Sequence, residues 1–361
     1  MSAMMIEQSV ARLFTDHVDR ALVERGEHGH WPAALWSQAE AHGLAWALAS
    51  EAAGGIGVTW SEAYPILRGL GYWQVPMPLA ETMVASLLLS LAGTEVPRGP
   101  ITLVDESAPT VVAYDGAAPS LVGHAARVPW ARHCRWALAS TGAQIALVDL
   151  HDARGVRIVQ RSNVAAEPSD DVNFNACACV AHAPNPLPGL DRPIRTLAAI
   201  ARGAMMVGAM ERLLEHSVQY ATDRVQFGRA IGSYQAIQQS LALMAGDVAA
   251  ARVAAMVACA DAPSAGSTAC AATLFSAAAA KIRTGEAATR AAAIAHQVHG
   301  AIGFTREHPL HFATRRLWAW RDECGSDAWW AQRLGEAAIA SRSAGFWPAL
   351  TRRHFDSGGR A

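Results

Sequence analysis

The spacing of apolar residues changes twice along this 361-residue chain. Short strand-like runs occupy the stretch from about 98 to 182, whereas helical spacing dominates before and after it. Side chains return to the same face every 3.6 residues in an α-helix and every two residues in a strand, so the spacing of apolar residues distinguishes the two. The sequence therefore predicts three consecutive parts: an N-terminal helical domain (1–97), a shortened middle β domain (98–182) and a C-terminal helical bundle (190–350).

The first part is predicted to hold four helices. Their expected bounds are residues 6–25, Pro32 to Gly43, a start at Ser61, and residues 79–91. In the second helix, Leu35 and Trp36 are expected to face inward. The GEHGH run and the glycines at 54, 55 and 57 mark breaks between helices.

Six short runs of β-branched and apolar residues predict the strands of the middle part. They are residues 101–104, 110–114, 136–139, 145–148, 156–159 and 172–180. Gly, Pro, Asp or Asn bounds each run, as is typical of strands joined by turns. We expect a small antiparallel barrel or sandwich, followed by a proline-rich linker at 183–189.

Long helical patterns then return and predict an antiparallel four-helix bundle. They cover residues 194–222, 233–259 and 268–298, with a shorter pair after Pro309 and after Asp327. Ser233 is the expected N-cap of the second long helix. Alanine dominates the third, which permits close helix approach.

Composition excludes several partners. The net charge is −1 and charged residues are 17% of the chain, so no polyanion-binding surface is expected and nucleic acid is not a predicted partner. The N-terminus lacks a basic region followed by an apolar core, and residues 87–91 are too short to span a bilayer. These features predict a soluble, cytoplasmic protein. Twelve tryptophans with so little charge favour an oligomer.

One loop and the helix behind it carry the strongest chemical signal. Arg224 supplies a fixed positive charge, Phe227 an aromatic ring, and Gln235, Gln238 and Gln239 supply amides at the helix start. Guanidinium groups pair with phosphate oxygens, rings stack, and amides both donate and accept. The set suits an anionic, partly aromatic ligand. The alternative is an ordinary capped helix with a solvated arginine.

Three runs resemble motifs of the acyl-CoA dehydrogenase family. Arg224-Val-Gln-Phe-Gly228, with Ile231 and Gln235, resembles the RxxFGxxIxxxQ signature. Gln297-Val-His-Gly-Ala-Ile-Gly-Phe304 resembles the QxxGGxGF loop, and Glu51-Ala-Ala-Gly-Gly-Ile-Gly57 more weakly resembles the PxxxGGxG turn. The order of helices, sheet and bundle is also that of this family. The resemblance covers nearly the whole chain.

The resemblance implies FAD as cofactor and an acyl-CoA thioester as substrate. By it, Arg224 would pair with the pyrophosphate, Phe227 would pack on the adenine side, and Gln235 would hydrogen-bond the nucleotide. Gln297 and Gly300 would touch a dinucleotide belonging to another subunit. Ala301 replaces the second glycine of the motif, so the backbone there would approach the phosphates less closely.

The middle domain departs from the family pattern. The run Ile101-Thr-Leu-Val-Asp-Glu106 stands where a TEPxxGSD-like segment belongs, and neither a GSD nor a WITN-like run follows. Most contacts to the flavin ring are therefore expected to be missing.

The catalytic base is the second departure, because the family removes an α-proton with a Glu while flavin accepts the β-hydride. The Glu of the usual Glu-Gly-Thr falls on Cys324, and the alternative base position falls near Ala198. Glu323, one residue early, is the remaining candidate. The other interpretation of Glu323 is a solvated or salt-bridged surface residue beside Arg321.

Histidines at 296, 299, 308 and 311 do not reproduce a known metal-ligand spacing, so no metal is predicted. The leading functional hypothesis is a degenerate subunit of a heteromeric acyl-CoA dehydrogenase, similar to those of bacterial steroid degradation, completing the FAD site with a partner dehydrogenase subunit. An electron-transfer protein would accept the electrons. The alternatives are a self-sufficient homo-oligomer using Glu323, and a flavin-free structural or binding subunit. The residues do not identify the acyl group.

Overall fold

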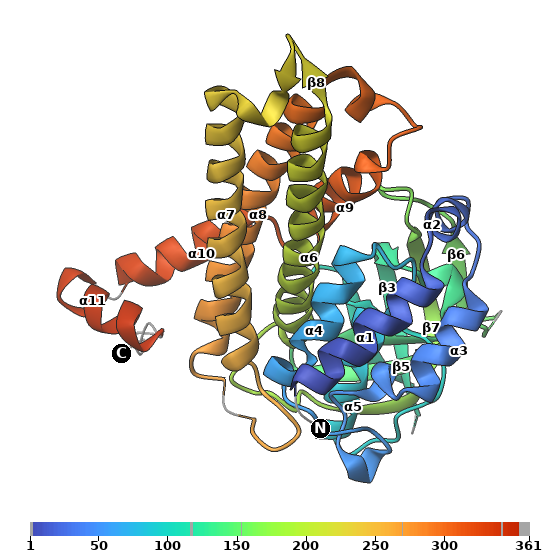
Figure 1. The fold of residues 1–361 in the computed structure, drawn as a ribbon. Coiled ribbons are helices and arrows are strands. Elements are labelled where there is room, and N and C mark those ends of the chain that lie inside the picture. The colour runs from blue at the N-terminus through green and yellow to red at the C-terminus, as the bar shows by residue number, and fades with distance from the viewer. Residues whose placement is uncertain (1–2, 116–117, 153, 269, 341, 354–361) are drawn as a thin grey trace. The chain divides into compact units, whose positions relative to one another are not determined.

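The computed structural model describes residues 3–115, 118–152, 154–268, 270–340 and 342–353 (Figure 1). The chain divides into two compact units. The first comprises Met1–Ile66, Pro76–Ala198 and Ala262–Cys270, and the second comprises Leu67–Val75, Ala199–Asp261 and Ala271–Ala361. Helices, a curled sheet and a helical bundle follow one another along the chain, which confirms the predicted fold class. The three domain boundaries remain predictions.

The N-terminal helices bury most of their apolar faces. They are α1 (Ala3–His17), α2 (Arg20–Glu27), α3 (Ala33–Ala41), α4 (Trp60–Tyr72) and α5 (Leu79–Leu91), with short 3-10 turns η1 (Leu44–Trp46) and η2 (Glu51–Ala53) between α3 and α4. Leu35 and Trp36 are buried as predicted. The single helix predicted over 6–25 is wrong, because Asp19 ends one helix and starts another. Its extended backbone and its side chain, which accepts from the Leu22 N–H at 2.7 Å, form an N-cap.

The glycine turn at 54–57 packs directly on backbone. A Cβ on Gly55 would come within 2.2 Å of the Ala49 carbonyl oxygen, and the Gly57 N–H donates to the same carbonyl at 2.8 Å. The glycines therefore close a connector between η2 and α4.

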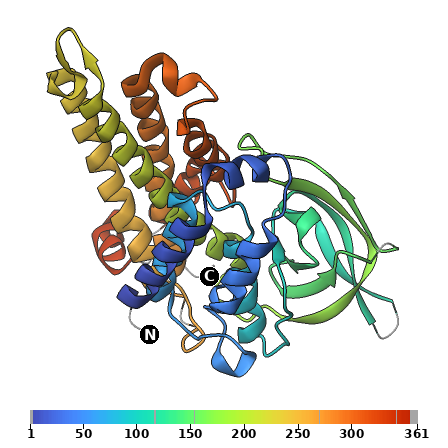
Figure 2. The ribbon, with the colours of Figure 1, turned by 45° about the vertical axis from the view of Figure 1, so that its right-hand side comes forward.

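Seven strands form the curled sheet of the first unit (Figure 2). They are β1 (Ile101–Val104), β2 (Thr110–Asp115), β3 (Ala118–Pro129), β4 (Trp136–Ser140), β5 (Gln144–Asp149), β6 (Val156–Val159) and β7 (Ser169–Pro184). The order is β1-β4-β5-β7-β3-β2, and β6 also pairs with β7. The pairs are antiparallel except β1 with β4, which is parallel, so the prediction of a purely antiparallel sheet is wrong there.

Strand β3 was not predicted from the sequence. Its register shifts between Leu121 and Gly123 and again between Ala125 and Val128. Gly123 and Arg127 have positive φ values of 137° and 56°. These bulges break the two-residue alternation that identifies a strand. The strand nevertheless contributes Leu121, which is fully buried, to the core of the sheet.

The C-terminal part is built from long antiparallel helices. They are α6 (Pro193–Asp223), α7 (Gln235–Ala260), α8 (Thr273–His299), α9 (Leu310–Asp322), α10 (Asp327–Ala340) and α11 (Arg342–Arg352), with β8 (Val225–Gln226), β9 (Arg229–Ala230), η4 (Ile231–Ser233) and η5 (Gly300–Phe304) between them. The predicted start of α8 is wrong, since the helix begins at Thr273 rather than 268, after a turn closed by Ser264 and Ser267. Helix α11 was not predicted.

Two glycines bring α4 and α6 into backbone contact within the second unit. A Cβ on Gly208 would lie 1.9 Å from the Arg68 carbonyl oxygen, and one on Gly71 would lie 1.7 Å from that of Met205. Arg68 also pairs with Glu211 at 2.5 Å. Any larger side chain at either glycine would force these helix segments apart.

Helix α7 is only 28% buried over its most apolar window, whose mean hydropathy is 1.7. It is long and apolar enough to cross a membrane. Core helices of soluble proteins meet the same criteria of length and composition. It packs along α8 in the second unit. Its outer face carries exposed Leu243, Val253 and Met256.

Candidate functional site

A β-hairpin presents the first part of the candidate site. Strands β8 and β9 pair across a two-residue turn, in which Phe227 and Gly228 have φ values of 53° and 81°. Such turns usually place Asn or Gly where this one has phenylalanine. The Tyr234 hydroxyl donates to the Gln226 carbonyl at 3.1 Å and braces the hairpin. Phe227 is consequently held 93% exposed.

Arg224 lies at the base of this hairpin. Its backbone carbonyl accepts from the Ile231 N–H at 2.8 Å, and its side chain is exposed. Among the described residues no carboxylate pairs with the Arg224 guanidinium. By contrast, the guanidinium of Arg229 lies 4.1 Å from the centroid of the Tyr234 ring. Arg224 can therefore accept an anion without first breaking an ion pair.

Gln235 is the first residue of α7 and is exposed. The predicted N-cap is wrong, since Tyr234 occupies that position without a side-chain hydrogen bond. Ser233 lies in η4, where its hydroxyl donates to the Ala230 carbonyl at 2.7 Å. The first N–H groups of α7 are thus not capped by a side chain at the N-cap.

The end of α8 carries a pocket of about 480 Å³. Gln297 and Gly300 line it together with three alanines and the rings of His296, Phe304 and Trp318. Gly300 ends α8 with φ 61° and ψ −142°, a conformation that only glycine adopts easily. The His296 and Phe304 rings stack with centroids 4.5 Å apart, and His296 Nε2 lies 3.2 Å from the Thr314 hydroxyl.

The five predicted cofactor residues fall into two groups. Gln297 and Gly300 share the pocket, whereas Arg224, Phe227 and Gln235 lie on the hairpin and at the start of α7. In Figures 1 and 2 the hairpin and the orange loop after α8 lie at the same end of the bundle. Sequence reasoning missed His296 and Trp318 as pocket residues.

Beneath this end of the bundle lies a cluster of imidazoles. The His299 ring stacks on Tyr220 at 4.5 Å and lies 4.7 Å from the ring of His308. Burial, with the nearby Arg212 guanidinium, lowers the pKa of His216 to about 4, and burial also lowers the pKa of His299. Within the described ranges, no group of three or more His, Cys, Asp or Glu residues is arranged to hold a metal ion.

Glu323, the weak candidate for the catalytic base, pairs with a buried arginine. Its Oε2 accepts from Arg202 Nε at 2.7 Å, and Arg202 is only 5% exposed. Glu323 is therefore salt-bridged, as one interpretation expects, with the buried Arg202 as partner. Arg321 donates to the Thr289 hydroxyl at 2.9 Å and lies 3.8 Å from Asp327. The alternative position, Ala198, carries no titratable group.

The turn that contains Glu323 is fixed by Lys281, the only lysine in the sequence. Its ammonium donates to the carbonyls of Trp320, Arg321 and Glu323 at 2.8, 3.0 and 2.9 Å. It is completely buried, and burial lowers its pKa to about 8. A tetrahedral ammonium can satisfy three converging carbonyls at the end of α9, which the planar guanidinium of arginine cannot match.

In the first unit, Asp105 and Glu106 occupy the place of the family's flavin-ring segment. The Glu106 carboxylate accepts from the N–H groups of Ile194 and Arg195 at 3.0 and 3.1 Å, and Asp105 accepts from Arg195 Nε at 3.1 Å. Burial raises the pKa of Glu106. Both acids therefore bind the first turn of α6, where a helix favours negative charge.

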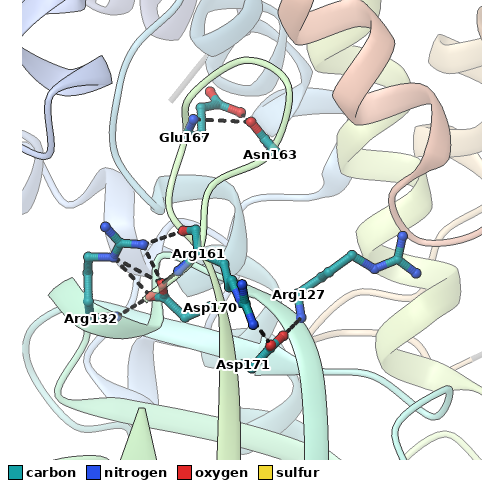
Figure 3. A network of polar contacts seen from close by, with 7 residues as sticks. All are labelled: Arg127, Arg132, Arg161, Asn163, Glu167, Asp170 and Asp171. Atoms are coloured by element: carbon teal, nitrogen blue, oxygen red, sulfur yellow. Dashed lines mark hydrogen bonds and ion pairs between the residues drawn. The ribbon is translucent and has the colours of Figure 1, made fainter. Parts of the chain in front are cut away.

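The largest charge network of the sheet is also structural (Figure 3). Asp170, fully buried, accepts from the Arg132 N–H at 2.9 Å and the Arg161 N–H at 2.9 Å, and it pairs with the Arg132 side chain at 2.5 Å. Asp171 pairs with Arg161 at 3.3 Å. Figure 3 shows the Arg127 side chain extending away from both carboxylates. The network ties the loop before β7 to the turn after β3.

Two family profiles match the chain. "Acyl-CoA dehydrogenase, N-terminal domain" covers residues 2–98, and "Acyl-CoA dehydrogenase, C-terminal domain" covers residues 196–336. Acyl-CoA dehydrogenase IpdE2 of Mycobacterium tuberculosis is 31% identical over 316 residues, or 86% of this chain and 89% of that protein. The chain belongs to the acyl-CoA dehydrogenase family. Its members are FAD-dependent oxidoreductases acting on the CH–CH bonds of acyl-CoA, so the predicted enzyme class and cofactor are confirmed.

Solved structures of this family share the fold. The Tcur3481-Tcur3483 steroid ACAD G363A variant superposes with a TM-score of 0.81 at 25% identity, covering 92% of this chain and 96% of that one. The ChsE4-ChsE5 complex from Mycobacterium tuberculosis gives 0.81 at 22% identity, covering 94% and 98%. At 22% identity, the second likeness shows the fold alone.

The residues of this acyl-CoA dehydrogenase family member fit the nucleotide end of FAD better than its ring end. The nucleotide end is served by an unpaired guanidinium at Arg224, an exposed ring at Phe227 and a glycine with positive φ at Gly300. The acids that replace the ring-contacting motif are already bound to α6. The described residues therefore fit the phosphate and adenine half of FAD better than its ring half, and the roles of the individual residues remain predictions.

Proposed function

We propose that this chain is a subunit of a heteromeric FAD-dependent acyl-CoA dehydrogenase, in which it completes the FAD site of a partner subunit that brings the ring contacts and the base. One observation carries the proposal. The groups predicted to contact the nucleotide, Arg224, Phe227 and Gln297, are exposed. Two acids at the sequence positions of the family's ring segment and base, Glu106 and Glu323, are instead engaged with the protein itself.

The chemistry is divided accordingly. FAD, when bound, supplies the acceptor for the β-hydride in α,β-dehydrogenation. In this chain the Arg224 guanidinium offsets phosphate charge, and Gln297 offers an amide to the nucleotide. The Glu323 carboxylate neutralises Arg202, so the proposal assigns the base to the partner.

The exposed face of α7 supports a partner subunit. Leu243 and Val253 are 68% and 61% exposed, and alanines surround them on the same face. A contiguous apolar helix face of this kind is covered by another protein chain in most soluble assemblies. One similar solved structure is named for two different proteins, Tcur3481 and Tcur3483, which favours a second, different subunit over a copy of this chain.

The same structure favours a steroid-derived acyl-CoA as substrate, because it is named as a steroid ACAD. We further propose a cytoplasmic location, with electrons passing to an electron-transfer protein.

Activity with and without a partner tests the proposal. The chain is purified alone and co-expressed with a candidate partner, an acyl-CoA dehydrogenase that carries the flavin-ring segments and the catalytic Glu. Dye-linked oxidation is then measured over a panel of acyl-CoA thioesters that includes steroid-derived ones. Turnover only in the co-expressed sample supports the proposal. Full turnover by the lone chain indicates a self-sufficient enzyme, and a stable complex whose flavin content does not depend on this chain indicates a structural subunit.

A further inference from the structure

The outer face of the sheet carries a row of polar side chains across three neighbouring strands. The register pairs Arg157 on β6 with Asn173 on β7, and Asn173 with His124 on β3. All three residues are exposed, whereas Val172, which alternates with them, lies in the core of the sheet. Because successive residues of a strand point to opposite faces, the three side chains share the outer face.

Arg127 adds a second cation beside this row. It lies in the bulge of β3 between Ala125 and Val128, with φ 56°, and its backbone N–H donates to the Asp171 carboxylate at 3.3 Å. Figure 3 shows the Arg127 side chain extending away from that carboxylate. A bulge can re-aim a side chain, and this one leaves the Arg127 guanidinium exposed to solvent.

The acid at this part of the face is already engaged. Asp171 pairs with Arg161 at 3.3 Å, and their side chains are 25% and 64% exposed. Among the residues that the structure describes, no carboxylate forms an ion pair with the guanidinium of Arg127 or of Arg157. Three arginines and one aspartate thus leave two uncompensated positive charges on the outer face.

Like charges that share a sheet face repel one another, so an arrangement of this kind is unfavourable until an anion offsets it. Another exposed arginine of the sheet does have an acid opposite: Arg135 pairs with Asp149 at 3.1 Å on the adjacent strand. Arg157 instead faces the neutral amide of Asn173. The guanidinium fork matches the oxygens of a phosphate group, which makes phosphates the favoured anions.

The spacing of the two cations indicates more than one phosphate. Arg127 and Arg157 lie on strands that flank β7, so their backbones are about two strand spacings, or roughly 10 Å, apart. Asn173 lies between them and offers an amide donor. Two separate cations with a donor between them suit a ligand whose phosphates are spread along its length.

We propose that the outer face of β3, β7 and β6 binds a ligand carrying two or more phosphate groups, with Arg127 and Arg157 as the phosphate-binding residues. Two sources share this chemistry. One is a free polyphosphate such as pyrophosphate. The other is the nucleotide end of coenzyme A, which carries a 3′-phosphate and a pyrophosphate; this source rests on the proposed function, in which an acyl-CoA is the substrate.

Calorimetric titration of the full chain with pyrophosphate and with adenosine 3′,5′-bisphosphate tests the assignment. We expect Arg127→Gln and Arg157→Gln each to weaken binding by about three- to tenfold, because each removes a partly screened charge contact with phosphate. Arg157→Lys keeps the charge and should retain most of the affinity. Arg12→Gln removes a guanidinium from α1, where the side chain is 87% exposed, and should leave binding unchanged.

The two ligands distinguish the sources. Tighter binding of adenosine 3′,5′-bisphosphate than of pyrophosphate supports coenzyme A, and equal or weaker binding overturns coenzyme A as the source. Absence of binding of both ligands to the wild type, or equal binding by the wild type and Arg157→Gln, overturns the phosphate site itself. Thermal melting of each variant confirms that a loss of binding is not a loss of fold.

These outcomes are separable from failure of the proposed function. A chain that never forms a heteromer can still bind pyrophosphate through Arg127 and Arg157. Conversely, a heteromer that forms and holds flavin, but whose Arg157→Gln variant binds both phosphate ligands like the wild type, would remove the phosphate site and leave the proposed function intact.

Discussion

Arg202 Nε and Glu323 Oε2 lie 2.7 Å apart, and this ion pair joins α6 to the end of α9. Arg202 is 5% exposed and the side chain of Glu323 is 25% exposed. A buried guanidinium without its carboxylate would cost several kcal/mol, about 3–5 in typical cases. Glu323, the carboxylate nearest in sequence to the family's base position, therefore stabilises the fold of this chain.

Glu323→Gln should therefore lower the free energy of unfolding and change the turnover rate only slightly. The amide keeps a hydrogen bond to Arg202 and loses the charge, so we expect a loss of about 1–3 kcal/mol in the free energy of unfolding. In the proposed heteromer the partner supplies the base, so the rate of the assembled enzyme should fall less than tenfold. Urea unfolding and dye-linked turnover measure the two effects, with exposed Glu95→Gln as control. A rate loss beyond about a thousandfold with flavin still bound would identify Glu323 as the base.

Lys281→Met should be among the most destabilising single changes in the bundle. It leaves three carbonyls at the end of α9 without a donor, at a cost of about 3–5 kcal/mol. Lys281→Arg should also destabilise, since a planar group cannot reach the same three oxygens. Unfolding midpoints in urea test both changes. Amine-reactive labelling gives a second measurement: Lys281 should react only when the protein unfolds, and rapid labelling of the folded chain would contradict its burial.

The sequence predicted the elements better than the roles of individual side chains. Apolar spacing gave the bounds of α5 as they stand, because its residues form one uninterrupted periodic run. It failed at β3, where two bulges break the alternation, and at α1 and α2, where Asp19 interrupts a continuous apolar stripe. The spacing of apolar residues does not reveal a helix break that depends on one capping side chain.

The candidate site shows the same limit. The motifs placed Gln297 and Gly300 correctly in one pocket, but Trp318 reaches that pocket from α9, a different helix. Arg202 and Glu323 are 121 residues apart, so no local pattern links them. Asp105 and Glu106 were noted as a departure from the family, whereas their binding to α6 depends on a contact about 90 residues away.

Arg224→Ala should lower the FAD occupancy of the assembled protein. Removing a charge-assisted phosphate contact costs about 1.5–3 kcal/mol, or one to two decades of affinity. Flavin retained on dilution and gel filtration measures the effect. Arg12→Ala, which removes a side chain 87% exposed on α1, is the control. Equal flavin retention by Arg224→Ala and the control would remove Arg224 from the site.

Stability should fall as the pH drops from about 6.5 to about 4. His216 has a folded-state pKa of about 4, below its ordinary value, and burial also lowers those of His296 and His299. Between the two values the unfolded chain binds more protons than the folded one, so acid favours unfolding. His216→Asn should flatten the dependence of the urea midpoint on pH in this window, whereas exposed His42→Asn should not. A pH slope unchanged by His216→Asn would contradict the assignment.

The flavin content of this chain, alone and in complex, tests the central claim most directly. Absorbance near the flavin band divided by chain concentration is measured for the chain purified alone, for the complete partner alone, and for the co-expressed complex. The account predicts little flavin on the lone chain and a yellow complex whose flavin is lost when Arg224 is replaced by alanine. One FAD per lone chain, held through gel filtration, would contradict the division of the site between two subunits.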